Sequence, residues 1–377
     1  MGDLLARGVE ALGDLLGPTW DVRVVSTPQE AAGAGGRRLD ALLEVHPEGG
    51  SVFAQLLIDL KSQVTPKVIE QQLLPKLDLV RQVTPHTHLV VMAPWLSPRS
   101  QEILRDRGIG YLDLTGNVFL RIPRPAIVIS TEGDRRAPRS EQPRSGKPTL
   151  AGPKAGRLVR LLADIAPPYR AGEVAAAARL SLPYVSRLLD ALEEQLLIRR
   201  EGRVIVDVDW VGLLRLRAGH LSLLRHNSYV GMLSPNGTRH LMMRLRDRER
   251  AGREPRVTLT GSYAAHAIAP LAVGGQVMLY VSADLDSTDT VADDLGLLRV
   301  DEGADVLLLR AYDEVVFERN RDVDGIRQVA LSQLVLDCLS GPGRMPAEGE
   351  AVLNYMAEDE RIWRASGIEH TQRVQEG

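Results

Sequence analysis

The sequence predicts an α/β protein that is built from more than one domain. Its 377 residues exceed what a single hydrophobic core usually organises. A composition of 44% hydrophobic and 25% charged residues is ordinary for a globular protein. Patterns typical of helices and of strands alternate along the chain, which indicates the α/β class. No apolar run is long enough for a transmembrane helix, so we expect no membrane association.

The beginning of the chain predicts an amphipathic helix and not a signal peptide, because it lacks a charged segment followed by an apolar block. The apolar residues expected on one side of this helix are Leu4, Leu5, Val9, Leu12, Leu15 and Leu16. The single cysteine, Cys338, excludes an internal disulfide. We therefore expect a cytoplasmic, nucleoid-associated protein. The net charge of −3 argues against a uniformly basic surface but not against local basic patches.

Residues 1–132 are expected to form a compact α/β domain. After the opening helix, β-branched and alternating segments predict strands, and helical spacing with proline in the first turn predicts helices. The expected order is a helix, strands at 20–25, 40–45 and 52–60, a helix at 66–83, a strand at 88–93, a helix at 97–107 and a hairpin at 111–122.

Residues 133–156 are predicted to be a linker, because Pro, Gly, Ser and Arg occur there without periodicity. Between residues 134 and 160 there are eight basic residues and two acidic ones. One interpretation is a solvated flexible tether. The other is a tether that also contacts phosphate groups.

Residues 157–218 carry the clearest pattern in the chain. Leucines at 158, 161 and 162 indicate a first helix, and the alanine-rich stretch at 171–180 indicates a second. Ser181 is a good N-cap for a third helix, whose buried stripe we expect to consist of Val185, Leu188, Leu189 and Leu192. A hairpin at 197–208 follows. Three helices and a two-stranded ribbon in this order predict a winged helix-turn-helix.

If the stripe faces inward, the other face of the third helix is available to double-stranded DNA. Residues near the N-terminus of a recognition helix contact base edges, and arginine can donate two hydrogen bonds to guanine. Arginines on the ribbon can follow the phosphate backbone. The expected DNA-binding residues are Ser181, Tyr184, Ser186, Arg187, Arg199, Arg200 and Arg203, with Glu201 as the one opposing acid on the wing. The alternative is a winged helix that serves protein interaction or dimerisation.

A second pattern lies in the first domain. Asp40 opens one strand, Asp59 and Lys61 end the next, and Gln71 follows on a helix. Asp59 and Lys61 are two apart on a strand, so both point to one face. This order resembles the PD-(D/E)XK endonuclease-like superfamily, although Leu39 stands where that pattern has proline.

The resemblance implies that Asp40 and Asp59 hold Mg²⁺ or Mn²⁺ and that Lys61 helps to activate a water molecule, with Gln71 nearby. Glu10 is a candidate additional acid. The alternative is an ordinary salt bridge at the end of a strand. A metal-dependent DNA endonuclease, targeted by the winged helix, is therefore the competing hypothesis to a regulator without catalysis.

Residues 219–377 are expected to form a C-terminal α/β domain, with helices to about residue 247, at 326–339 and at 347–356. The turn Thr260-Gly261-Ser262, between a strand and a helix, resembles the nucleotidyltransferase fold. Active members carry two carboxylates on the next strand, but the strand at 276–281 has no acid, and Asp284 and Asp286 follow it in a predicted loop. We therefore expect this domain to be inactive and to bind no cofactor.

Taken together, the chain resembles the AbiEi-like regulators, the antitoxin family of type IV abortive-infection systems. The resemblance is carried by the winged helix at 158–208, by 257–265 and by 329–356 with Gly341-Pro-Gly-Arg. It implies a transcription regulator that binds double-stranded DNA, with flanking domains for dimerisation or sensing. A homodimer is expected, and the sequence identifies no partner toxin. The N-terminal segment, including 108–117, departs from the short antitoxins, which makes a stand-alone regulator an equal alternative.

Overall fold

A computed structural model shows that the chain is a mixed α/β protein with two compact units. The structure describes residues 2–26, 40–83, 87–123, 126–134, 150–270, 275–282 and 285–368. The first unit comprises Met1–Lys147 with Glu194–Leu196, and the second comprises Pro148–Glu193 with Leu197–Gly377. The boundary expected after residue 218 therefore falls inside the second unit. Most of the predicted linker, residues 135–149, lies outside the described residues.

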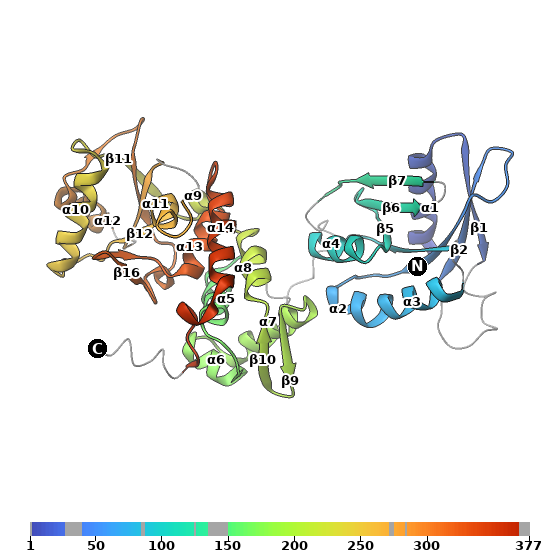
Figure 1. Cartoon of the computed structure of the whole chain (residues 1–377), viewed down its shortest axis with the longest axis horizontal. Helices are drawn as coiled ribbons and strands as arrows, with labels where there is room; N and C mark the ends of the chain where they lie inside the picture. Colours follow the sequence, from blue (N-terminus) through green and yellow to red (C-terminus); the bar gives the residue numbers. More distant parts are fainter. Residues whose placement is uncertain are drawn as a thin grey trace. The chain divides into compact units, whose positions relative to one another are not determined.

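The first unit is organised around a seven-stranded sheet whose strands follow chain order, β1 to β7 (Figure 1). β3, β4 and β5 run parallel, and the other neighbours are antiparallel. The strands are β1 (Trp20–Ser26), β2 (Ala41–Pro47), β3 (Ala54–Leu60), β4 (Thr87–Ala93), β5 (Gly110–Asp113), β6 (Val118–Pro123) and β7 (Ala126–Thr131).

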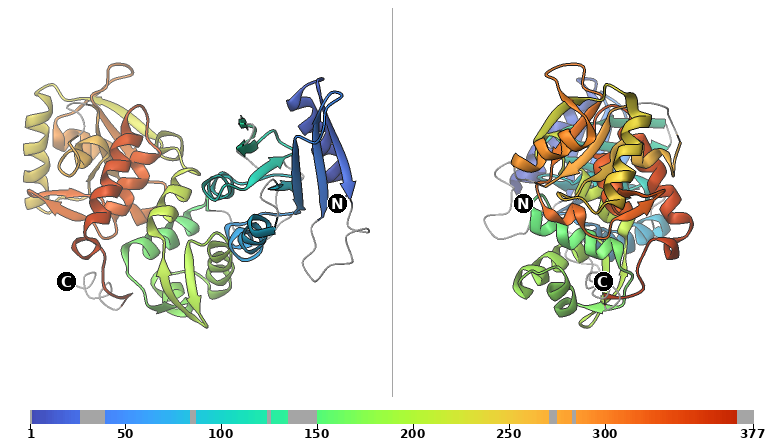
Figure 2. Two further views of the ribbon diagram at one scale, coloured as in Figure 1. Left: turned by 45° about the vertical axis from the view of Figure 1, so that its right-hand side comes forward. Right: turned by 90° about the vertical axis from the view of Figure 1, so that its left-hand side faces the viewer.

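Helices cover both faces of this sheet (Figure 2). The alternation of β4 shows the two faces, because Val90 and Met92 pack with α1 (Gly2–Leu16) whereas Leu89 and Val91 pack on the other side. That other side is covered by α2 (Pro66–Val68), the π-helical turn η1 (Ile69–Leu73), α3 (Leu74–Val83) and α4 (Pro98–Asp106). Gly8 lets α1 approach the sheet, since a Cβ there would lie 2.7 Å from the Met92 sulfur.

The expected helices and strands of this unit are present, with three differences. Leu15, expected on the buried side of the first helix, is 40% exposed because it lies in the last turn, at the end of the contact with the sheet. β7 was not predicted. The helix expected at 66–83 contains the π turn, which ends just before Pro75, because proline has no N–H to continue the regular hydrogen-bond ladder.

Residues 153–208, which we call the helix-ribbon segment, belong to the second unit except for Glu194–Leu196. It consists of α5 (Pro153–Asp164), β8 (Tyr169–Arg170), α6 (Ala171–Ala177), α7 (Leu182–Glu194), β9 (Ile198–Glu201) and β10 (Val204–Val208). The three strands form a sheet in the order β8-β10-β9, so the short β8 extends the expected two-stranded ribbon. All four residues of the expected stripe on α7 are buried.

The rest of the second unit surrounds another mixed sheet, in the order β14-β11-β15-β13-β12-β17-β16. Its strands are β11 (Tyr229–Leu233), β12 (Thr258–Thr260), β13 (Val277–Val281), β14 (Leu298–Arg299), β15 (Val306–Arg310), β16 (Arg321–Val323) and β17 (Ile326–Gln328). Its helices are α8 (Trp210–Ala218), α9 (Leu223–His226), α10 (Gly237–Arg250), α11 (Gly261–His266), α12 (Leu285–Leu295), α13 (Leu331–Leu339) and α14 (Met345–Glu358), with 3-10 turns η2 (Glu314–Phe317) and η3 (Glu360–Ile362).

Three expectations for this region were wrong. The helical stretch to residue 247 is interrupted by β11, which pairs with the buried strand β15. The segment at 326–339 starts as β17, since Ile326–Gln328 pairs with β16, and becomes helical only at Leu331. Asp286 lies in α12 and not in a loop, whereas Asp284 is outside the described residues. In each case pairing or packing with distant segments decided the structure.

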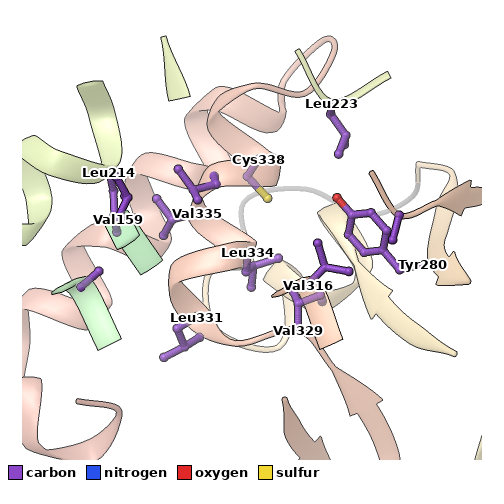
Figure 3. Packing of buried hydrophobic residues seen from close by; sticks show 14 of the residues in the cluster. Val159, Leu214, Leu223, Tyr280, Val316, Val329, Leu331, Leu334, Val335 and Cys338 are labelled. Carbon is purple, nitrogen blue, oxygen red and sulfur yellow. The ribbon is translucent and has the colours of Figure 1, made fainter. Parts of the chain in front are cut away.

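One hydrophobic core joins the helix-ribbon segment to the rest of the second unit. Figure 3 shows Val159 of α5, Leu214 of α8 and Val335 of α13 packing together, beside the buried Cys338. Burial raises the pKa of the Cys338 thiol. Among the described residues, none of the helices combines the length and apolar character needed to cross a bilayer.

Candidate nucleic-acid interface

α7 presents a polar face on the side opposite its buried stripe. Val185 and Leu189 face the core, so Pro183, Arg187 and Asp190, which lie on the other side of the helix, are exposed. Ser181, just before the helix, is also exposed, and Ser186 is half-buried at the edge of the face. The residues expected to contact DNA are thus accessible at the N-terminal half of α7.

Two arginines of this surface form no ion pair within the part of the chain that the structure describes. Arg187 on α7 and Arg203 at the ribbon turn are both exposed, and neither has a hydrogen-bond or ion-pair partner among the described residues. The turn that carries Arg203 is tight, with Gly202 at a φ of +63°. As far as the described residues extend, the donors of these guanidinium groups are available to an external acceptor.

The other two ribbon arginines are paired within the chain. Arg200 lies 2.7 Å from the carboxylate of Asp190 and 2.5 Å from that of Glu193, both on α7. The hydrogen bond to Glu193, followed by that to Asp190, raises the pKa of Arg200. Arg199 lies 2.6 Å from Glu201. The sequence suggested a single opposing acid, but α7 supplies two more, because packing brings the helix beside the ribbon.

Tyr184, another expected DNA-binding residue, is only partly accessible. Its ring packs against the core of the second unit. Burial raises the pKa of its hydroxyl, and the nearby charges of Arg217 and Arg187 oppose that shift. The residue therefore anchors α7 as well as bordering its exposed face.

A buried polar network holds the helix-ribbon segment against α13 and the turn before β16. The Arg160 guanidinium of α5 donates to Ser332 at 3.3 Å and to the side-chain oxygen of Gln333 at 3.2 Å. Asp164 receives a hydrogen bond of 2.6 Å from Arg319. Burial alone would raise the pKa of Asp164, but Arg319 and Arg160 lower it overall. This network attaches α5 to α13 and to the turn before β16.

The residues of the endonuclease-like pattern come together in part. The pairing of β2 and β3 ends with Ala41 opposite Ile58, and the backbone N–H of Asp40 donates to the Ile58 carbonyl at 3.1 Å, so Asp40 lies beside the end of β3 that carries Asp59. The Lys61 Nζ lies 2.9 Å from one oxygen of the fully buried Asp59. The carboxylate of Asp40 accepts a hydrogen bond of 2.8 Å from the backbone N–H of Leu60.

Two other members of that pattern do not join the site. Gln71 is exposed on the π turn. Glu10 is exposed on α1, which covers the face of the sheet opposite to Asp59.

Lys76 of α3, which the sequence pattern did not indicate, binds the second oxygen of Asp59. The only signal available in the sequence was Pro75, which marks an irregular helix just before it.

The donor set at Asp59 does not fit a divalent metal ion. Ammonium groups face both oxygens of the Asp59 carboxylate, and one oxygen of Asp40 is committed to the backbone. Within the described residues, no three histidine, cysteine, aspartate or glutamate side chains gather as a metal-binding group. A metal ion would have to displace at least one lysine to reach Asp59.

At Gly261-Ser262, where α11 begins, the serine side chain also has a hydrogen-bond partner within the chain. The Ser262 hydroxyl donates to the carboxylate of the buried Glu348 at 2.6 Å. The neighbouring strand β13 is entirely buried and carries no acid, as expected from its sequence.

Next to this turn lies a buried carboxylate with neutral partners. Asp337 accepts hydrogen bonds from Thr260 at 2.6 Å, Gln333 at 2.8 Å and Tyr280 at 2.9 Å. Burial raises the pKa of Asp337 to about 6, although these hydrogen bonds and Arg160 act in the opposite direction. No lysine or arginine donates to this carboxylate in the described part of the chain.

Comparison with known proteins adds no relative, since no family model, curated protein or solved structure matches this chain.

Proposed function

We propose that the protein is a sequence-specific regulator that binds double-stranded DNA and that the helix-ribbon segment is its winged helix-turn-helix. The observation that carries this proposal is a pair of exposed arginines, Arg187 on the outer face of α7 and Arg203 at the ribbon turn, which form no ion pair with any residue that the structure describes. An exposed guanidinium at each of these two positions matches what a recognition helix and a wing need for DNA.

In the proposed complex, the N-terminal half of α7 enters the major groove. Arg187 donates two hydrogen bonds to a guanine, and Ser186 contacts a neighbouring base edge. Ser181 holds a phosphate group at the start of the helix, while Arg203 contacts the backbone beside the groove. Arg200 has a different task from the one the sequence suggested, because it neutralises Asp190 and Glu193 and so reduces their repulsion of DNA.

The flanking regions are proposed to act without catalysis. Asp59 is bound by Lys76 and Ser262 by Glu348, both within the chain. These internal contacts support binding or sensing functions in place of endonuclease-like and nucleotidyltransferase-like chemistry. Such an arrangement is compatible with an AbiEi-like regulator that binds its operator as a homodimer.

The test is a titration of the full chain against end-labelled DNA from its own upstream region, at several salt concentrations. We expect a salt-sensitive shift with the DNA intact. The double variant Arg187→Ala/Arg203→Ala should lose specific binding. Arg225→Ala removes an exposed arginine of α9 and is the matched control, which should bind normally. Equal binding by the double variant and the control would refute the proposed interface.

The same titration with Mn²⁺ addresses the competing nuclease function, which the adjacency of Asp40, Asp59 and Lys61 favours. DNA shortening that depends on Mn²⁺ and disappears in Asp59→Ala would establish cleavage. Intact DNA under the same conditions supports the regulator.

A further inference from the structure

The Asp59 carboxylate is the one member of the endonuclease-like pattern that is completely enclosed. Its side chain is fully buried, and the Lys61 and Lys76 side chains beside it are only 21% and 17% exposed. A buried carboxylate is strongly destabilising unless a positive charge compensates it. Two candidates for that charge are present, and they differ in geometry.

Lys76 is the better placed of the two lysines. Its ammonium group donates a direct hydrogen bond to one oxygen of Asp59. The Lys61 Nζ lies 2.9 Å from the other oxygen, which accepts no hydrogen bond from any described residue. Asp59 is therefore held mainly by Lys76, and Lys61 adds a neighbouring charge.

The position of Lys76 depends on the irregular helix that precedes it. In the π turn, the backbone N–H of Leu74 donates to the carbonyl of Ile69, which adds one residue to the turn before Pro75. This shifts the helical register, and Lys76 then lies on α3 beside the end of β3. The irregular helix at Pro75 thus places the Lys76 ammonium group beside the Asp59 carboxylate on the sheet.

We propose that the Lys76 ammonium is a built-in cation that takes the position a divalent metal ion would have at Asp59. The cluster is then complete without metal, since the ammonium groups of Lys61 and Lys76 lie at the two oxygens of Asp59, while the Asp40 carboxylate accepts from the backbone N–H of Leu60. This inference concerns the N-terminal unit and does not rest on DNA binding by the helix-ribbon segment.

A latent metal site follows from this arrangement. Removal of the Lys76 charge leaves one Asp59 oxygen without its partner, next to Asp40 across the β2–β3 pair. Two adjacent carboxylates attract Mn²⁺ or Mg²⁺ when one of their oxygens is not already bound by an ammonium group, and Lys61 lies at the other oxygen of Asp59. Removal of Lys61 has a smaller consequence, because Lys76 stays on Asp59.

The experiment is calorimetric titration of the folded full chain with MnCl₂. The wild type is expected to show no Mn²⁺ site that depends on Asp59. Lys76→Met should gain one Mn²⁺ per chain, and the gain should vanish in Lys76→Met/Asp59→Asn. Lys61→Met is the matched control and should gain none.

A second readout is thermal unfolding with and without MnCl₂, since a ligand that binds only the folded state raises the melting temperature. We expect Mn²⁺ to raise it for Lys76→Met and to leave it unchanged for the wild type and for Lys61→Met. Lys76→Gln repeats the test with a polar side chain if the methionine variant does not fold.

Two results would overturn the proposal. One is a Mn²⁺ site in the wild type that Asp59→Asn removes, and this comparison requires no lysine variant to fold. The other is a folded Lys76→Met or Lys76→Gln chain that binds no additional Mn²⁺.

Discussion

The Asp59 cluster and the outer face of α7 are both rich in charge, but they use it in opposite ways. In the cluster, two lysines face one buried carboxylate and the charges are satisfied inside the fold. On α7 and the ribbon, Arg200 is paired while Arg187 and Arg203 remain exposed and without partners among the described residues. The comparison shows that charged residues alone do not indicate a binding site. What distinguishes the two regions is whether the fold already uses the charges.

The largest effect should follow removal of the buried carboxylate. Asp59→Ala leaves two mostly buried ammonium groups without their counter-charge, and we expect the free energy of unfolding to fall by about 3 kcal/mol. Urea unfolding measures the loss, and hydrogen exchange of the β3 amides locates it. Asp78→Ala, at an exposed aspartate of α3, should change stability little. If Asp59→Ala lost DNA affinity but kept its stability, the Asp59 cluster would be a DNA-binding site and not a structural ion pair.

Asp337 sharpens the contrast, because this buried carboxylate has neutral partners where Asp59 has cations. Its pKa is raised to about 6 from an ordinary 3.8, so the folded state binds the proton more tightly than the unfolded state does. Its contribution to stability is therefore greatest below pH 4 and is lost as the pH rises through about 6.

We expect the wild type to lose about 2.5 kcal/mol relative to Asp337→Asn between pH 4 and pH 7. Denaturant unfolding of both proteins across this range measures the difference. Parallel pH profiles would show that Asp337 is ionised with an ordinary pKa.

Arg187→Ala tests whether the outer face of α7 binds DNA. If Arg187 contacts a guanine, specific DNA binding should weaken by about 2 kcal/mol, whereas binding to unrelated DNA should change far less. Fluorescence anisotropy with the upstream DNA and with a scrambled duplex separates the two. Equal losses on both duplexes would assign Arg187 to the phosphate backbone.

Arg200→Ala should have a smaller effect, of about 1 kcal/mol, on both specific and non-specific DNA. The reason is that Asp190 and Glu193 then repel the phosphates without their internal counter-charge. Adding Asp190→Asn and Glu193→Gln should restore most of the affinity. No recovery would mean that Arg200 contacts DNA directly.

The smallest effect is expected for Arg203→Ala, which removes the single phosphate contact that we propose for this residue. The affinity at moderate salt should fall by less than about 1 kcal/mol, and the slope of log K against log salt should decrease by about 1. Titrations at four or more salt concentrations measure the slope. An unchanged slope would place Arg203 away from the DNA.

Local patterns predicted much of this architecture correctly. The stripe of Val185, Leu188, Leu189 and Leu192 is buried because 3.6-residue periodicity needs no knowledge of distant partners. The alternation of the strands in the first unit was equally informative. The errors arose where a distant segment decided the outcome, as for β11, which is a strand because it pairs with β15.

For the candidate sites, the sequence by itself determined which residue types stand near one another along a strand or helix. It placed Asp59 beside Lys61 and put Arg187 on the outer face of α7. Only the tertiary structure decided which charges neutralise one another, since Lys76 reaches Asp59 from 17 residues away and Arg200 reaches Asp190 and Glu193 from a different element. Ion pairing depends on distance in space and on burial, and neither can be inferred from local periodicity.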